Sequence, residues 1–185
     1  HNPDIEIPDY NLDKARKLMA EAGYADGFKM TIHGTNNRYI NDGKLAQAVG
    51  QMLARLNIDV TVETQPVTGY YNKARGKEMS MFMVGWGSTS GEASKVMRPA
   101  LTSGSINNYG GYENKKFNEI FTEASQTLDD EKRNQLLGEA MQIAMKEVAI
   151  IPTHFQVNVW ASRKGFKVIP RTDELTLPAY IIGSN

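Results

Sequence analysis

Short helical and strand patterns alternate along the first 84 residues, and this alternation constrains the fold more than any other feature of the sequence. Their apolar spacing predicts helices over 12–22, 45–56 and 67–75, and strands over 28–32, 58–62 and 79–84. Units of this length are joined by right-handed crossovers, so that consecutive strands lie parallel. We therefore expect an α/β fold in which a mixed, mostly parallel sheet is flanked by helices.

The apolar run Met79–Val84 is the predicted central strand. It shows little alternation, which is typical of a strand buried on both faces. The run stops at Gly85-Trp86-Gly87-Ser88, and a short amphipathic helix follows until Pro99 ends it. Because ligands bind open α/β sheets beyond the carboxyl ends of the strands, Trp86 is expected to present a flat surface to a ligand. The alternative is that Trp86 fills the end of the core.

The second half of the chain predicts two longer helices and one more strand. Asn114 and Asp129 are placed to cap the two helices with their side-chain oxygens. Apolar and polar residues then alternate over 150–161, which predicts a strand with Phe155 on its apolar face and His154 on its polar face.

Composition excludes several classes of function. The 21 basic and 21 acidic residues cancel, so the chain has no electrostatic footprint for nucleic acid or an anionic membrane surface. The absence of cysteine removes disulfides, thiolate metal sites and cysteine nucleophiles, and it fits a periplasmic protein. No apolar run approaches the roughly 18 residues of a membrane span.

Candidates for catalysis or metal binding are few. The three histidines are too scattered for metal-ligand spacing, and no G-x-S-x-G elbow or phosphate-binding glycine loop occurs. The acidic cluster at 129–131 begins a helix, where carboxylates complement the helix dipole. We therefore expect no catalytic residue, no metal and no cofactor, and His154 is at most a residue lining the crevice. A small α/β hydrolase or transferase and a stand-alone interaction domain are the alternatives to a domain that binds a ligand without converting it.

Five segments of the chain resemble solute-binding proteins of peptide-type ABC importers, the family 5 binders of dipeptides, oligopeptides, nickel complexes and glutathione. The segments are Tyr10–Phe28, Arg38–Thr64, Val84–Ser94, Gly111–Ala124 and Ile150–Phe166. The resemblance implies one lobe of a type II periplasmic binding protein. Because family members are two-lobed and more than twice as long, 1–150 is expected to be the core of the C-terminal lobe. Residues 151–185 would return toward the hinge and the missing N-terminal lobe.

The resemblance also implies a mechanism and a set of ligand-binding residues. A small peptide or peptide-like ligand enters between the lobes, the hinge closes over it, and the closed form docks on the permease subunits of an ABC importer in the bacterial periplasm. The expected ligand-binding residues come from three loops and the last predicted strand: Asn36, Asn37, Arg38, Tyr39, Trp86, Gly87, Ser88, Thr89, Asn108, Tyr109 and His154.

One position departs from the family pattern. Peptide-binding members commonly carry an aspartate three residues after the tryptophan, where it pairs with the α-ammonium group of the ligand. Thr89 occupies that position here, and the nearest acid is Glu92. Because a hydroxyl does not supply this charge pairing, the variant loop is open to a different ligand, glutathione-like peptides among them.

Overall fold

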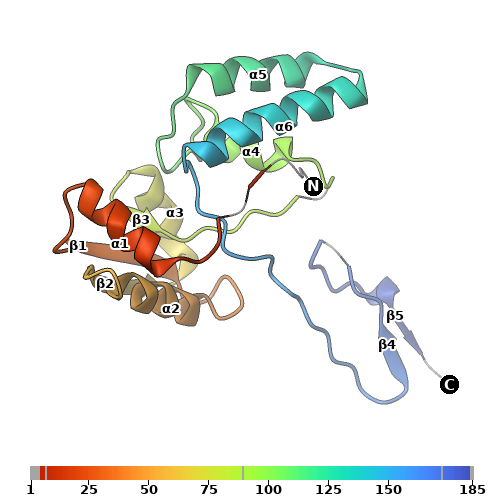
Figure 1. Cartoon of the computed structure of the whole chain (residues 1–185). Coiled ribbons are helices and arrows are strands. Elements are labelled where there is room, and N and C mark those ends of the chain that lie inside the picture. The colour runs from red at the N-terminus through yellow and green to blue at the C-terminus, as the bar shows by residue number, and fades with distance from the viewer. Residues whose placement is uncertain (1–4, 7, 89, 172, 184–185) are drawn as a thin grey trace.

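The computed structural model describes residues 5–6, 8–88, 90–171 and 173–183, and it arranges them in three parts (Figure 1). The first part contains α1 (Leu12–Glu21), β1 (Lys29–Thr35), α2 (Asp42–Ala54), β2 (Asp59–Gln65), α3 (Val67–Arg75) and β3 (Met81–Phe82). The second is a group of helices, α4 (Ser94–Leu101), α5 (Lys115–Gln126) and α6 (Asp130–Lys146). The third holds β4 (Phe166–Val168), the 3₁₀ turn Pro178–Tyr180 and β5 (Ile181–Gly183).

The first part is a parallel sheet of three strands in the order β2-β1-β3. Ile32 of β1 pairs with Val62 of β2 on one side and with Met81 of β3 on the other. Helix α2 covers β1 and β2 so closely that a Cβ atom at Gly50 would lie 2.9 Å from Val62 Cγ2. The predicted α/β class, with a mostly parallel sheet flanked by helices, is confirmed.

The predicted central strand is wrong in position and in burial. Of Met79–Val84, only Met81 and Phe82 form a strand, which lies at the edge of the sheet and is half-buried. The central strand is β1, where Ile32 has no exposed surface. The reason is that apolar composition does not determine how many neighbours a strand has. Only β1 pairs on both sides among the described strands, so its residues receive the most cover.

Helix ends follow the local sequence closely. The side-chain oxygens of Asn11, Asn114 and Asp129 each accept the N–H of the residue three positions on, at 2.7–2.8 Å. Pro99, in contrast, lies inside α4 and does not end it. Met97 and Leu101 on either side of Pro99 are fully buried, so the packing of the last turn offsets the missing N–H of the proline.

The helical part has its own core. Residues from all three helices meet in it, and α5 and α6 lie side by side along their length (Figure 1). The fully or nearly fully buried members are Met97, Leu101, Phe117, Phe121, Ala124, Leu137, Ala140 and Ala144. No helix of the described part of the chain has the length and apolar character needed to span a membrane.

The predicted strand over 150–161 is also wrong, although its alternation is present. Residues 151–163 are extended but form neither helix nor strand, and no backbone hydrogen bond joins 151–161 to other described backbone groups. Phe155 is 98% exposed and Val159 83%, whereas Gln156 on the other face is half-buried. A strand requires a neighbour, and the described residues offer none here; the chain leads away to the separate β4–β5 hairpin (Figure 1).

Replacement of Ile32 tests the position of β1 in the sheet. We expect Ile32→Ala to lower the free energy of unfolding by about 2–5 kcal/mol, because it leaves a cavity in a fully buried site. Met52→Ala on the exposed side of α2 is the control and should cost less than about 0.5 kcal/mol. Urea unfolding of both variants measures the difference, and equal costs would contradict the central position of β1.

Candidate functional site

The carboxyl ends of the three parallel strands lie on one side of the sheet, which we call the sheet edge. Two of the predicted ligand-binding loops follow these strand ends. Strand β1 leads into residues 36–41, and β3 leads into residues 83–93. Because parallel strands present their carboxyl ends together, this edge is the place where an open α/β sheet binds ligands. The structure thus brings the Asn36–Tyr39 loop and the Trp86 turn to one edge of the sheet.

Asp42 fixes the first of these loops. One oxygen of its buried carboxylate accepts the hydroxyl of Thr35 at 2.8 Å and the backbone N–H groups of Arg38 and Tyr39 at 3.0 and 3.1 Å, and the other accepts the N–H of Gly43 at 2.9 Å. Burial raises the pKa of Asp42, but these hydrogen bonds outweigh it and hold the pKa below its ordinary value of 3.8. The carboxylate is therefore ionised at neutral pH and fully occupied. Sequence analysis missed this role; the signal was an acid at the start of a helical pattern after a polar loop.

In the Asn36–Tyr39 loop, some side chains face solvent and others hold the loop in place. Asn36 is exposed, and its backbone N–H donates to Gln65 at the end of β2 at 3.1 Å. The amide oxygen of Asn37 accepts the N–H of Val67, which ties the loop to the start of α3. The exposed guanidinium of Arg38 lies 4.8 Å from the centre of the Tyr39 ring. Arg38 is thus a cation that faces solvent with an aromatic ring as its support.

The Trp86 turn combines an exposed aromatic ring with an open backbone. Trp86 is 36% exposed, and a Cβ atom added at Gly87 would meet no atom within 4 Å. The hydroxyl of Ser88 donates to the carbonyl of Glu92 at 3.3 Å, which folds the turn back on itself. Thr89 lies outside the described residues. Trp86 and Gly87 therefore offer accessible surface, while the ring of Tyr39 covers one side of Gly85.

Glu92 is not available to a ligand. Its two oxygens accept Nε and a terminal nitrogen of Arg133 at 2.5 and 2.9 Å, and the hydroxyl of Ser94 also donates to it. These bonds, first of all those from Arg133, lower the pKa of Glu92 to about 2. The pair joins the loop after Trp86 to α6, and no local pattern of the sequence predicts it.

The third predicted loop reaches the sheet edge through one aromatic ring. Tyr109 stacks on Tyr71 of α3 with ring centres 6.0 Å apart, and it meets Phe82 of β3 edge to face. The amide of Asn108 instead bonds within its own loop, to the carbonyls of Thr102 and Tyr112 and the N–H of Tyr112. Asn108 thus shapes the loop, and direct contact of either residue with a ligand stays a prediction.

His154 lies apart from these loops in its hydrogen bonding. Its ring is exposed, and Nδ1 is 3.1 Å from the hydroxyl oxygen of Thr153. The same segment does touch the first loop two residues later, where the side-chain oxygen of Gln156 accepts the N–H of Ile40 at 3.3 Å. In the described part of the chain, no three His, Asp or Glu side chains gather closely enough to hold a metal ion.

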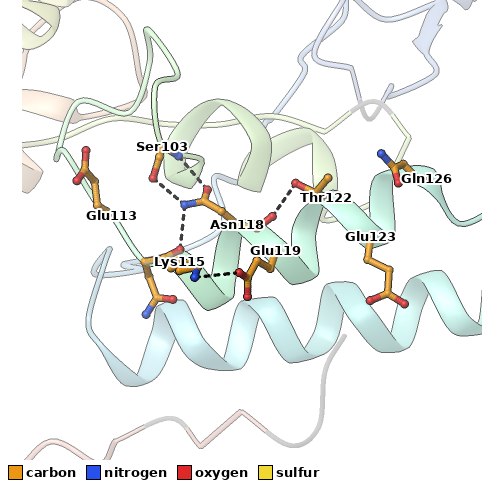
Figure 2. A pocket seen from close by; sticks show the side chains of 9 residues that line it. Ser103, Glu113, Lys115, Asn118, Glu119, Thr122, Glu123 and Gln126 are labelled. Carbon is orange, nitrogen blue, oxygen red and sulfur yellow. Dashed lines mark hydrogen bonds and ion pairs between the residues drawn. The ribbon is translucent and has the colours of Figure 1, made fainter.

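A separate hollow of the described surface lies along α5 (Figure 2). It has a volume of about 870 Å³ and is lined by side chains of α5 and of the loop before it. Asn118 bonds to Ser103 there, and Lys115 pairs with Glu119 at 3.7 Å. Its walls are mostly exposed polar groups that already bond to one another, so we place the candidate site at the sheet edge, where strand ends and an exposed aromatic ring coincide.

A family profile matches residues 1–108, which is more than half of the chain: the bacterial extracellular solute-binding proteins, family 5 Middle. The chain belongs to this family. The membership predicted from the five sequence segments is therefore confirmed, and the family is one of solute-binding proteins.

Curated relatives agree with this assignment. The chain is 30% identical over 175 residues to the glutathione-binding protein GsiB of Salmonella choleraesuis (strain SC-B67), which covers 88% of the chain and 34% of that protein. It is 29% identical, with the same coverage, to GsiB of Escherichia coli (strain K12). The chain thus spans about a third of the length of the curated relatives that it matches.

Solved structures show the same architecture. HbpA2 from Haemophilus parasuis matches the whole chain and 38% of its own, with a TM-score of 0.83 and 23% identity, which shows the fold. The periplasmic binding protein DppA from Helicobacter pylori, in complex with peptide STSA, has a TM-score of 0.73 and 27% identity over 80% of this chain and 30% of its own. Haemophilus influenzae OppA, in complex with RPPGFSPFR, has a TM-score of 0.69 and 29% identity over 76% and 28%.

Acid titration tests the ion pair between Glu92 and Arg133. Because the folded pKa of about 2 lies below the ordinary 4.5, the pair contributes its full stabilisation above about pH 4.5 and loses it as the pH falls toward 2. We expect Arg133→Gln to raise the pKa of Glu92 and to flatten the fall in unfolding free energy over this range. Lys132→Gln, which removes an exposed pair with Glu123, is the control. A parent-like acid profile in Arg133→Gln would refute the assignment.

Proposed function

We propose that this chain is the ligand-binding lobe of an extracytoplasmic solute-binding protein that delivers a small peptide or peptide-like solute to an ABC importer. The observation that carries the proposal is the exposure of Trp86 and Arg38 on two neighbouring loops at the sheet edge. The chain that carries these loops belongs to the family 5 solute-binding proteins. Ligand enters between this edge and a second lobe, and closure of the cleft buries it from both sides. The function is binding without chemical conversion.

The charges at this edge favour a ligand that presents a carboxylate. Both acids of the two loops are occupied: Asp42 by four hydrogen bonds and Glu92 by Arg133. Arg38 has an exposed guanidinium, whose planar fork suits a carboxylate. Trp86 supplies a flat surface for the apolar part or the peptide planes of the ligand, and Gly87 leaves the backbone open to close approach.

Glutathione-like peptides fit this description best. Glutathione has two carboxylates and an amino group on its γ-glutamyl end, and the relatives that align over 88% of the chain are glutathione-binding proteins. Thr89, in place of an acid, agrees with a lobe that does not hold an α-ammonium group. Asn36, Asn37, Ser88, Tyr109 and His154 are proposed to complete the ligand-facing surface.

Residues 151–185 are proposed to join this lobe, formed by 1–150, to the N-terminal lobe of the same protein. Support comes from the apolar side chains left uncovered there: Phe155 and Val159 are almost fully exposed, and the backbone of 151–161 is unpaired among the described residues. An extended segment with a free backbone and one apolar face is suited to pairing with a further strand. The permease subunits of the importer would contact both lobes once the cleft has closed.

Loss of Trp86 is the test of the proposed site. In the full-length protein, we expect Trp86→Ala to weaken binding of glutathione or a short peptide by about 1–3 kcal/mol, the scale of a buried aromatic contact. Tyr24→Ala is the control, because Tyr24 is an exposed aromatic residue just before the amino end of β1. Isothermal calorimetry with glutathione and a panel of tripeptides measures both. Unchanged affinity for every ligand that the parent binds would exclude a contact between Trp86 and the ligand.

Arg38 tests the preference for a carboxylate. We expect Arg38→Ala to weaken binding of a ligand with a free carboxylate by about 1.5–3 kcal/mol, the range of a hydrogen bond to a charged group, and to leave its amide analogue unaffected. Arg55→Ala is the matched control, since Arg55 also lies over an aromatic ring, that of Tyr10, but beyond the far end of α2. An equal loss for the acid and its amide would exclude the carboxylate contact.

A further inference from the structure

The backbone just before Trp86 is held by tyrosine hydroxyl groups. Strand β3 ends at Phe82, and the last bond to the neighbouring strand is that of Met83; among the described backbone groups, none bonds to Gly85. The N–H of Met83 donates to the hydroxyl of Tyr70 at 3.1 Å, and the N–H of Gly85 donates to the hydroxyl of Tyr39 at 2.9 Å. The N–H of Met83 also donates to the carbonyl of His33 in β1 at 2.9 Å, so pairing with the sheet persists there. At Gly85, two residues on, the hydroxyl of Tyr39 takes the place of a strand partner.

We propose that Tyr39 is a positioning residue for Trp86: its hydroxyl clamps the backbone of Gly85 and so fixes where the tryptophan ring meets a ligand. Tyr39 thereby couples the loop after β1 to the loop after β3. The clamp itself is a property of the unliganded protein, and only its last step, the contact between Trp86 and a ligand, rests on the proposed function.

The hydroxyl of Tyr39 has enough partners to be fully used. It lies 2.9 Å from the nitrogen of Gly85, 3.2 Å from the carbonyl oxygen of the same residue, and 2.7 Å from the hydroxyl of Tyr71. Tyr39 has one proton to donate and can accept two. Donation from Tyr71 to Tyr39, and from Tyr39 to Gly85, satisfies all three contacts. Burial and the bond to Tyr39 raise the pKa of Tyr71, so that this donor keeps its proton at neutral pH.

Gly85 and Tyr39 are matched in shape as well as in hydrogen bonding. A Cβ atom at Gly85 would lie 2.6 Å from Cε1 and 3.0 Å from Cζ of the Tyr39 ring. The ring of Tyr39 cannot move away freely, because its hydroxyl bonds to Gly85 and the backbone N–H of Tyr39 donates to the carboxylate of Asp42 at 3.1 Å. Glycine is therefore required at 85 by the tyrosine.

No other contact explains the position of Trp86 as well. Among the described residues, no aromatic ring stacks on Trp86 and no hydrogen bond of its indole is present, whereas Trp160 donates to Thr176 at 3.0 Å. Without a polar or stacked partner, the direction of the ring depends on apolar packing around its covered part and on the placement of its backbone. The backbone is fixed one residue earlier, where Gly85 bonds to the hydroxyl of Tyr39. The backbone N–H of Tyr39 in turn bonds to Asp42 at the start of α2.

The test removes the hydroxyl and keeps the ring. In the full-length protein, we expect Tyr39→Phe to speed hydrogen exchange at the Gly85 amide about 2- to 10-fold, the effect of one lost hydrogen bond. In protein labelled with 5-fluorotryptophan, the fluorine resonance of Trp86, assigned with Trp86→Phe, should shift or broaden. Tyr71→Phe should give the same changes to a smaller extent, because it removes a partner of Tyr39 but leaves Gly85 bonded.

Tyr112→Phe is the matched control. Its hydroxyl donates to Glu147 at 2.6 Å, just after the end of α6, so its loss removes a strong hydrogen bond that is not part of the contact between Tyr39 and Gly85. We expect this variant to leave both the Gly85 exchange rate and the Trp86 resonance unchanged. Parent-like exchange and resonance in Tyr39→Phe, or the same changes in Tyr112→Phe, would overturn the clamp.

Binding separates the clamp from the proposed function. With glutathione as the probe, Tyr39→Phe should weaken affinity about 2- to 10-fold, in step with the exchange at Gly85, and Tyr112→Phe should not. Failure of the parent to bind glutathione or trialanine would count against the proposed ligand class, while the exchange and fluorine measurements still decide the clamp. Normal glutathione affinity in a Tyr39→Phe variant with a released Gly85 would overturn the positioning role.

Discussion

The pairing of β1 on both sides is the constraint on which the rest of the sheet depends. Ile32 aligns with Val62 on one side and Met81 on the other, and the parallel direction of both pairings brings the ends of three strands to one edge. The loops that carry Arg38 and Trp86, the two side chains proposed to contact a ligand most directly, follow from these ends. The loops are held to a large extent by bonded polar groups: the buried carboxylate of Asp42, the hydroxyl of the half-buried Tyr39 and the hydroxyl of the buried Tyr70.

Because the supporting groups are bonded and the ligand-facing groups are exposed, the site can be accessible and still well defined. Buried polar groups are costly unless they are satisfied, so the loop positions that satisfy Asp42 are strongly preferred over others. The exposed groups, Trp86 and Arg38, then lie on supports that do not themselves need a ligand. Affinity gains when the receptor is ordered before binding, because less entropy is lost on association.

Local features of the fold were predictable from the sequence, and non-local ones were not. Caps at Asn114 and Asp129 depend on three neighbouring residues, and both were predicted. The place of Met79–Val84 in the sheet depends on which strands lie beside it, and apolar composition alone does not specify that. The alternation of 150–161 was read correctly as a pattern but not as a strand, because strand formation also needs a partner. At the candidate site, Trp86 and the first loop came from sequence, whereas Asp42 and Tyr71 emerged only from three-dimensional contacts.

The ion pair between Glu92 and Arg133 has a consequence for how the chain folds. Its two members are 41 residues apart. Bringing two residues of this separation together closes a long loop, which has an entropic cost. Until the pair has formed, the segment after Trp86 has strand β3 behind it but no such anchor ahead. The ligand-facing turn is therefore completed only when helix α6 has packed beside the loop that follows Trp86.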